Sequence, residues 1–250
     1  MTGLFSEMAE YYDLMNSFKN YRRETTRLIG LVRRYGRSGG REWLDVGCGT
    51  GRHLRYLSRR FRCTGVDASS QMLRVARREV PGVRFERGDM RTFRLGKQFD
   101  VVSCLFSAIG HVRTESGLRR AIASLAAHVK PGGVLIIEPW FTPKTWHVGM
   151  VHLLTAGTSD LKLARASYST ARGSQSILRM HFLIARKGRG VHYKAVTGIS
   201  GLFEHATTLK WLRKAGLRSR FYRQGLMLDR GLFVGVRPLP PVRRRAQRGR

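Results

Sequence analysis

Two periodicities of hydrophobic residues alternate along residues 1–143. Apolar positions three and four residues apart predict a helix at 24–35, whereas short apolar runs that end near glycine or aspartate predict buried strands. Strands are expected at 43–46, 63–66, 83–86, 99–106 and 133–138, and further helices at 52–60, 70–78 and 118–128. Because helices separate the strands, we expect an α/β fold with a doubly wound, mostly parallel sheet. In such a fold the ligand binds at the carboxyl ends of the strands.

The hydrophobic pattern changes after residue 143. Alternating runs separated by glycine-containing turns predict strands at 164–170, 177–185 and 191–202, which suggests an antiparallel β meander that covers the active site as a lid or wall. A helix at 208–215 and a strand at 232–236 follow. The expected organisation is a helical cap (1–40), an α/β core (41–143), a β insertion (144–206), a closing helix and strand (207–237) and a basic disordered tail (238–250).

The chain is strongly basic, with 47 Lys and Arg against 16 Asp and Glu and a net charge of +31. Such a charge can attract nucleic acid or other anions through its long-range field. The arginines are spread along the whole chain, however, and form no aromatic-interleaved stretch of the kind that binds single strands. We therefore attribute most of the charge to composition and solvated helix faces, which leaves a nucleic-acid partner open as an alternative.

Other bulk features narrow the class of protein. With 42% hydrophobic residues the chain can bury one sizeable core. No apolar run approaches the length of a membrane span, and the first ten residues lack the order of a signal peptide, so we expect a cytoplasmic protein without a membrane partner. Cys48, Cys63 and Cys104 form no C-x-x-C pair, so neither a metal site nor a disulfide is expected.

A glycine-rich turn, LDVGCGTG at 44–51, follows the first predicted strand. It is one residue shorter than the G-x-G-x-x-G dinucleotide fingerprint, and no Gly-Lys-Ser/Thr follows as in a P-loop. A nucleoside without phosphates fits this pattern. Its amino acid part would pack on the loop, Asp67 after the second strand would accept both ribose hydroxyls, and Asp89 and Met90 after the third would contact adenine. This description matches S-adenosylmethionine (SAM).

Four separated motifs carry a resemblance to a known family. LDVGCGTG, GVDAS at 65–69, GDM at 88–90 and VKPGG at 129–133 occur in the order found in class I SAM-dependent methyltransferases, whose core is Rossmann-like. The chain closely resembles this family. The expected cofactor-binding residues are Asp45, Gly47, Cys48, Gly49, Gly51, Asp67, Ala68, Asp89, Met90 and Leu105.

The resemblance becomes more specific outside these motifs. YYDL at 11–14 and the segments 88–112, 129–143, 181–193 and 229–236 resemble the N,N-dimethyltransferases of dTDP-3-amino-3,6-dideoxyhexoses, over nearly the whole chain. This resemblance implies a SAM domain with an antiparallel sheet, often a homodimer, that methylates the amino group of a dTDP-linked amino sugar. Two positions depart from the family: His111 stands where Tyr is common, and Thr197-Gly198 stands near an expected His.

Methyl transfer from a sulfonium places few demands on the protein. The methyl group is already activated, so holding a neutral amine in line with the S–CH₃ bond is the main task. A base would help an amine that arrives protonated, and His111 is the candidate for this catalytic role. Arg230 is expected to bind the diphosphate of the acceptor. The other expected acceptor residues are Tyr12, Tyr21, Trp140 and His181.

Two other functions remain as alternatives. The first is a nucleic-acid (RNA) methyltransferase, which only the basic charge supports, because the sequence lacks an Asn/Asp-Pro-Pro-Tyr motif. The second is a non-catalytic SAM-binding scaffold that the basic tail would tether to an acidic partner.

Overall fold

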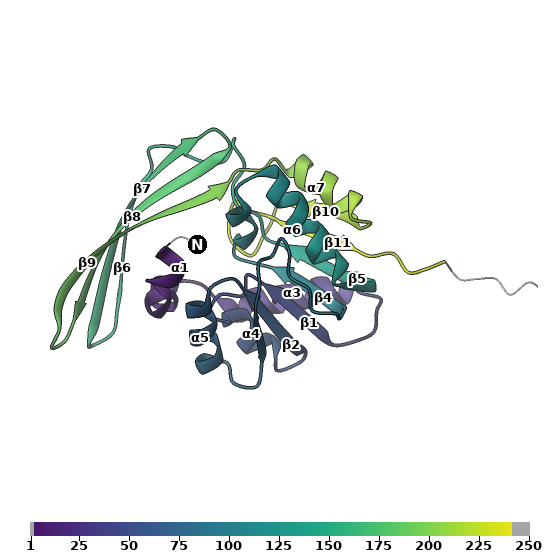
Figure 1. Cartoon of the computed structure of the whole chain (residues 1–250), viewed down its shortest axis with the longest axis horizontal. Coiled ribbons are helices and arrows are strands. Elements are labelled where there is room, and N and C mark those ends of the chain that lie inside the picture. Colours follow the sequence, from purple (N-terminus) through teal and green to yellow (C-terminus); the bar gives the residue numbers. More distant parts are fainter. Residues whose placement is uncertain (1–2, 242–250) are drawn as a thin grey trace, which may run out of the picture.

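A computed structural model describes residues 3–241. Residues 242–250, the greater part of the expected tail, lie outside the described residues. The described chain forms a seven-stranded sheet flanked by helices and a separate four-stranded sheet that projects from it (Figure 1). No helix among residues 3–241 is long and apolar enough to cross a bilayer.

The seven-stranded sheet has the order β10-β11-β5-β4-β1-β2-β3. The neighbouring pairs from β5 to β3 are parallel, and β11 and β10 continue the sheet in antiparallel pairing. The chain order reverses between β1 and β4, which is where an open α/β sheet binds its ligand. The strands are β1 (Glu42–Val46), β2 (Arg62–Asp67), β3 (Arg84–Arg87), β4 (Phe99–Cys104), β5 (Val129–Ile137), β10 (Arg218–Tyr222) and β11 (Leu232–Val236).

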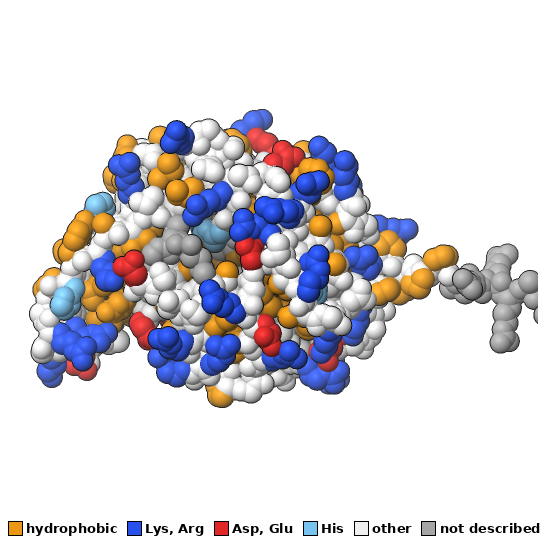
Figure 2. Space-filling view, in the orientation of Figure 1, with side chains coloured by type: hydrophobic (Ala, Val, Ile, Leu, Met, Phe, Trp, Pro, Cys, Tyr) orange, Lys and Arg blue, Asp and Glu red, His pale blue; other side chains and the backbone are white. Residues whose placement is uncertain are grey.

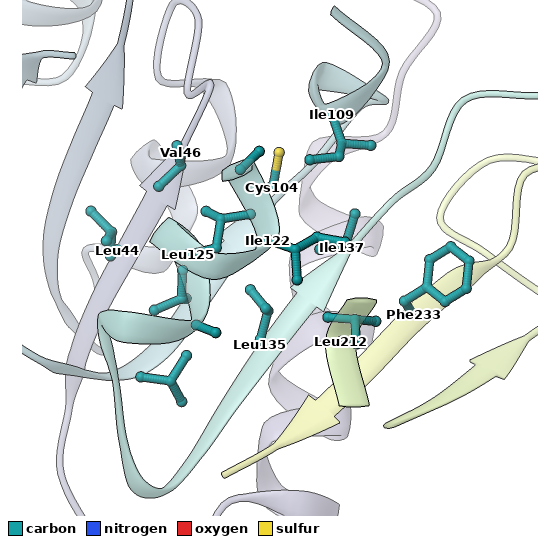
Figure 3. Packing of buried hydrophobic residues seen from close by; sticks show 14 of the residues in the cluster. Leu44, Val46, Cys104, Ile109, Ile122, Leu125, Leu135, Ile137, Leu212 and Phe233 are labelled. Atoms are coloured by element: carbon teal, nitrogen blue, oxygen red, sulfur yellow. The ribbon is translucent and has the colours of Figure 1, made fainter. Parts of the chain in front are cut away.

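Helices cover both faces of this sheet. The helices on one face are α3 (Tyr21–Tyr35), α4 (Arg52–Leu57) and α5 (Ser70–Glu79). The helices on the other face are α6 (Glu115–Ala127) and α7 (His205–Lys214). The short 3-10 helix η2 (Ala108–Val112) precedes α6 in the chain. Side chains of Asn20, Ser69 and Thr114 cap α3, α5 and α6 by accepting a backbone N–H from the first turn. Figure 3 shows the core between α6 and the sheet, where Ile122 and Leu125 face strand residues such as Leu135.

The second sheet is antiparallel, in the order β6-β7-β8-β9. Its strands are β6 (Val151–Gly157), β7 (Leu161–Arg172), β8 (Gln175–Arg186) and β9 (Gly190–Gly201). One face packs Met180 and Phe182 against Met8 and Met15. These two methionines belong to the N-terminal segment, which contains α1 (Gly3–Ser6), η1 (Ala9–Tyr11) and α2 (Tyr12–Met15). This segment lies between the second sheet and α5 (Figure 1).

The α/β alternation and the meander agree with the sequence pattern, but two strands, β6 and β10, do not follow from it. β6 was missed because its apolar residues do not alternate cleanly with polar ones: Val151 and Leu153 are exposed. β10 is a short edge strand with exposed Arg218 and Arg220, a pattern that resembles a charged loop. The meander therefore has four strands, and an antiparallel hairpin rather than a single strand closes the large sheet.

Candidate active site

A cavity of about 350 Å³ opens at the carboxyl ends of β1, β2 and β4. It lies at the reversal point of the large sheet, as the fold predicts. Helical residues of the N-terminal segment also contribute to its wall. The lining residues are Phe5, Tyr12, Tyr21, Asp45, Gly47, Cys48, Gly49, Thr50, Arg52, His53, Asp67, Ala68, Met72, Gly88, Asp89, Met90, Arg91, Leu105, Phe106, Ala108, His111, Val112 and Arg113.

The glycine turn forms the floor of this cavity, and its glycines serve different purposes. Gly49 has φ +56°, and a Cβ built there would meet nothing within 4 Å, because it would point into the cavity. A Cβ on Gly47 would lie 2.6 Å from Cβ of Ala108. Gly51 does not line the cavity: it precedes α4 with φ +78°, and its Cβ would lie 3.2 Å from Phe85. Gly51 therefore permits close packing, and the structure does not bring it to the expected cofactor contact.

Asp67 links the glycine turn to the end of β2. One carboxylate oxygen accepts the backbone N–H of Gly49 (2.9 Å), and the other accepts that of Ser69 (2.8 Å). Burial raises the pKa of Asp67, and these two amide donors partly oppose the rise. Ala68 follows Asp67 on the cavity wall. The carboxylate is thus held rigidly at the position where the sequence predicts ribose hydroxyls.

Asp45 places a second carboxylate under the cavity. Its side chain accepts a hydrogen bond from the Ser103 hydroxyl at 2.7 Å, and Ser103 in turn accepts from Nε1 of Trp43 at 2.8 Å. Burial raises the pKa of Asp45 to about 6, while the nearby His53 acts in the opposite direction. A buried carboxylate in this position suits a cationic group of the ligand better than an anionic one.

The remaining expected cofactor residues also line the cavity. Asp89 accepts hydrogen bonds from the backbone and the guanidinium of Arg91, and this side-chain contact lowers the pKa of Asp89. Met90, Cys48 and Leu105 add apolar surface to the cavity wall. The cavity therefore has carboxylates at the ends of β1, β2 and β3 and apolar surface between them, an arrangement that fits a nucleoside.

The N-terminal segment, expected from the sequence as a helical cap, closes one side of the cavity. The backbone carbonyl of Phe5 accepts the Ser69 hydroxyl at 2.6 Å, and Thr50 donates to Asp13 at 2.6 Å. Tyr12 and Tyr21, expected as acceptor residues, line the same cavity. Burial raises the pKa of both phenols, so both stay protonated and can donate hydrogen bonds. The YYDL motif at 11–14 was the sequence signal for this wall.

His111 faces the cavity from η2. Its Nδ1 lies 3.5 Å from the Ser200 hydroxyl at the end of β9, and its ring meets Phe5 edge-on with centroids 4.7 Å apart. The residue is exposed toward the open cavity, yet the protein packed around its ring desolvates the imidazole and lowers the pKa of His111 to about 4. The imidazole is therefore neutral near pH 7. Its contact with Ser200 is where the second sheet reaches the site.

The other expected acceptor residues lie outside the cavity wall. Arg230 stacks over Trp140, with its guanidinium carbon 4.6 Å from the ring centroid, next to the cavity residue Phe106. His181 lies on the exposed face of β8, where Nδ1 is 2.6 Å from the Tyr193 hydroxyl. The structure does not bring His181 to the cavity, because residue 181 points away from the face of β8 that packs on the N-terminal segment.

A doubly wound sheet with a glycine turn after β1 and carboxylates near the carboxyl ends of β1, β2 and β3 is typical of the class I SAM-dependent methyltransferases. A methyltransferase domain model matches residues 44–133. The dTDP-3-amino-3,6-dideoxy-alpha-D-glucopyranose N,N-dimethyltransferase of Streptomyces fradiae is 37% identical over 92% of this chain and 91% of its own. The dTDP-3-amino-3,4,6-trideoxy-alpha-D-glucopyranose N,N-dimethyltransferase of Streptomyces venezuelae is 37% identical over 91% and 97%.

Solved structures agree with these relatives. The crystal structure of Streptomyces venezuelae DesVI has a TM-score of 0.87 at 36% identity and covers 92% of this chain and 98% of that one. SAM-bound CalS10, an amino pentose methyltransferase from Micromonospora echinaspora, has a TM-score of 0.79 at 35% identity over 88% and 92% of the two chains. The chain belongs to the family of SAM-dependent sugar N-methyltransferases.

Proposed function

We propose that the enzyme methylates the amino group of a dTDP-linked amino sugar twice, to give an N,N-dimethylamino sugar. The identity to dTDP-amino-sugar N,N-dimethyltransferases extends over more than nine tenths of the chain and so includes the acceptor side as well as the SAM domain. The proposal includes a cytoplasmic location for this reaction. A basic surface plays no part in this proposal, since Figure 2 shows Lys and Arg spread over the visible face rather than gathered at one site.

In this proposal the cavity holds SAM, which supplies an activated methyl group. Asp67 accepts the ribose hydroxyls, Asp89 and Met90 contact the adenine, and Asp45 faces the ammonium group of the methionine part. Gly47 and Gly49 leave room for the ligand, with Cys48, Ala68 and Leu105 as apolar wall. The open space at Gly49 and the fixed carboxylate of Asp67 support these roles.

The protein's contribution to the reaction is alignment. The amine lone pair forms the new N–C bond while the S–C bond breaks and its electrons remain on sulfur, giving S-adenosylhomocysteine (SAH). The amine must lose a proton, which His111 or water can accept. Positioning of this kind can lower a barrier by roughly 7–11 kcal/mol in favourable cases. Tyr21, which is buried, and Tyr12, which is partly buried, are both neutral and line the cavity, so they are suited to orient the amine.

His111→Gln is expected to lower kcat only a few-fold. Because its pKa is about 4, His111 is a weak base near pH 7, whereas an essential general base would contribute about 10²–10⁴-fold. The kcat/KM profile of the wild type should likewise show no His111 titration between about pH 5.5 and 8. Steady-state kinetics with both enzymes test this. A thousandfold loss with unchanged SAH affinity would instead identify His111 as the base.

Turnover tests the proposed function directly. Purified enzyme with SAM and dTDP-3-amino-3,6-dideoxyglucose should give mono- and then dimethylated product by mass spectrometry. An enzyme that binds SAH but leaves amino sugar nucleotides unmodified would contradict the proposal. Methylation of RNA that falls steeply as salt rises would favour the nucleic-acid alternative, because that binding depends on counterion release. SAH binding without turnover on either substrate would favour the scaffold.

We also propose a homodimer that forms through the outer face of the second sheet. This face carries large apolar side chains that are exposed in the single chain, a pattern that marks an interface. The residues are Val151, Leu153, Tyr168, Leu183, Val191 and Tyr193. Such a dimer would bury His181 between the two copies. A monomer in sedimentation experiments at micromolar concentration would contradict it.

A further inference from the structure

Glu138, directly after β5, carries a carboxylate that has no role in the proposed SAM site. Its side chain is fully buried, and it does not line the cavity. One oxygen accepts the backbone N–H of Phe106 at 2.7 Å, and the other accepts that of Met227 at 3.2 Å. Glu138 therefore connects two loops that are remote in sequence, one after β4 and one before β11.

The first of these loops is conformationally strained. Phe106 has φ +48° and Ser107 has φ +60°, and a bulky residue adopts such values only where its surroundings fix them. The Ser107 hydroxyl donates to the carbonyl of Pro139 at 2.6 Å and accepts from Nη1 of Arg230 at 3.0 Å. Phe106 itself lines the cavity. The Glu138 carboxylate and the Ser107 hydroxyl thus hold this loop from two sides.

The second loop carries Arg230. No carboxylate among residues 3–241 lies within 4.0 Å of its guanidinium. Of the more distant negative groups, Glu138 has the largest favourable effect on the charged form of Arg230. Burial lowers the pKa of Arg230, but a guanidinium stays charged in proteins. Ser107 takes one of its five N–H donors. Beside the cavity, Arg230 is thus a partly buried cation with donors to spare for an anion.

We infer that Glu138 is a positioning residue for the acceptor. By holding the Phe106 and Met227 amides it places the Arg230 guanidinium against Trp140 and next to Phe106, where the acceptor's diphosphate would bind. Its negative charge offsets part of the cost of desolvating the Arg230 guanidinium, which has no direct ion pair. The inference rests on the proposed function for the identity of the anion. It predicts that Glu138 affects acceptor binding and leaves SAM binding unchanged.

Glu138→Gln is the main test. Glutamine keeps the size but offers one acceptor and one donor to two N–H groups, so one loop loses its partner. The free-energy cost of a buried unpaired amide corresponds to about a 5- to 150-fold change in an equilibrium constant. We expect the KM for the dTDP-amino sugar, measured by steady-state kinetics, and the Kd for dTDP, measured by calorimetry, to rise by about tenfold or more. The Kd for SAH, also measured by calorimetry, should stay within about twofold of the wild-type value.

Asp100→Asn is a matched control. Asp100 is likewise buried and accepts a backbone N–H, from Glu42 at 2.9 Å, beside the cation of Lys130. It lies at the opposite end of β4 from the site. The two substitutions should lower the melting temperature by similar amounts, but Asp100→Asn should leave the acceptor KM and dTDP affinity within about twofold of the wild type. Equal acceptor effects in both variants would reduce Glu138 to a structural role and overturn the inference.

Ser107→Ala tests the same arrangement without removing the carboxylate. It removes the tether of Arg230, so dTDP affinity should fall, and the double variant with Glu138→Gln should lose less than the product of the two effects. A folded Glu138→Gln enzyme with unchanged acceptor KM and dTDP affinity overturns the inference alone. A wild type that neither methylates the amino sugar nor binds dTDP overturns the proposed function, and the inference with it.

Discussion

Gly49→Val should abolish SAM binding while the protein still folds. The valine side chain would occupy the cavity, since nothing in the protein lies within 4 Å of the Cβ position. Side chains forced into occupied space cost about 1–3 kcal/mol or more, and here the ligand has nowhere to move, so we expect at least about a hundredfold loss of affinity. Calorimetry with SAH measures this loss, and circular dichroism checks the fold.

Backbone strain has to be separated from lost space in this experiment. Gly49 has φ +56°, a region that valine avoids. Gly96 has φ +61°, an equally open Cβ position and no place on the cavity wall, so Gly96→Val is a matched control with similar strain. It should lower the melting temperature without affecting SAH. If Gly49→Val retained full affinity, the glycine turn would not be the SAM site.

The SAM half of the site could be predicted because its residues follow directly from strand order. The carboxyl ends of parallel strands converge at one edge of the sheet, so Asp45, Asp67 and Asp89, each near the end of a different strand, had to lie close together. All expected cofactor residues except Gly51 line one cavity. Gly51 differs because sequence alone does not tell whether a glycine makes room for a ligand or for a neighbouring side chain.

The acceptor half could not be predicted in the same way. A sequence motif indicates Arg230, but its stacking on Trp140 and its hydrogen bond to Ser107 depend on loops that no local periodicity places together. Glu138 was missed for the same reason, because its partners Phe106 and Met227 are 32 and 89 residues away.

The N-terminal segment shows the same limit. Its elements are three or four residues long, too short for a helical pattern to identify them, and they pack against α5 and the second sheet. Because these contacts join residues that are far apart in the sequence, local patterns could not predict the position of the N-terminal segment.

Asp67→Ala should weaken SAH binding by about a hundredfold or more. The carboxylate offers charge-assisted hydrogen bonds to the ribose hydroxyls, each worth about 1.5–3 kcal/mol, and it also holds the Gly49 amide and thus the glycine turn. Loss of affinity alone does not separate these two roles. An SAH analogue without the ribose 2′-hydroxyl does, because it removes the partner of Asp67 without disturbing the turn.

The four affinities of wild type and Asp67→Ala for SAH and its 2′-deoxy analogue form a thermodynamic cycle. If Asp67 binds the ribose, the wild type should lose about tenfold or more on going to the analogue, whereas Asp67→Ala, which has already lost this bond, should lose little. If both proteins lost affinity for the analogue equally, Asp67 would act only through the Gly49 turn. The ribose would then need another partner on the cavity wall, and Asp89 is the neighbouring carboxylate that a second cycle would test.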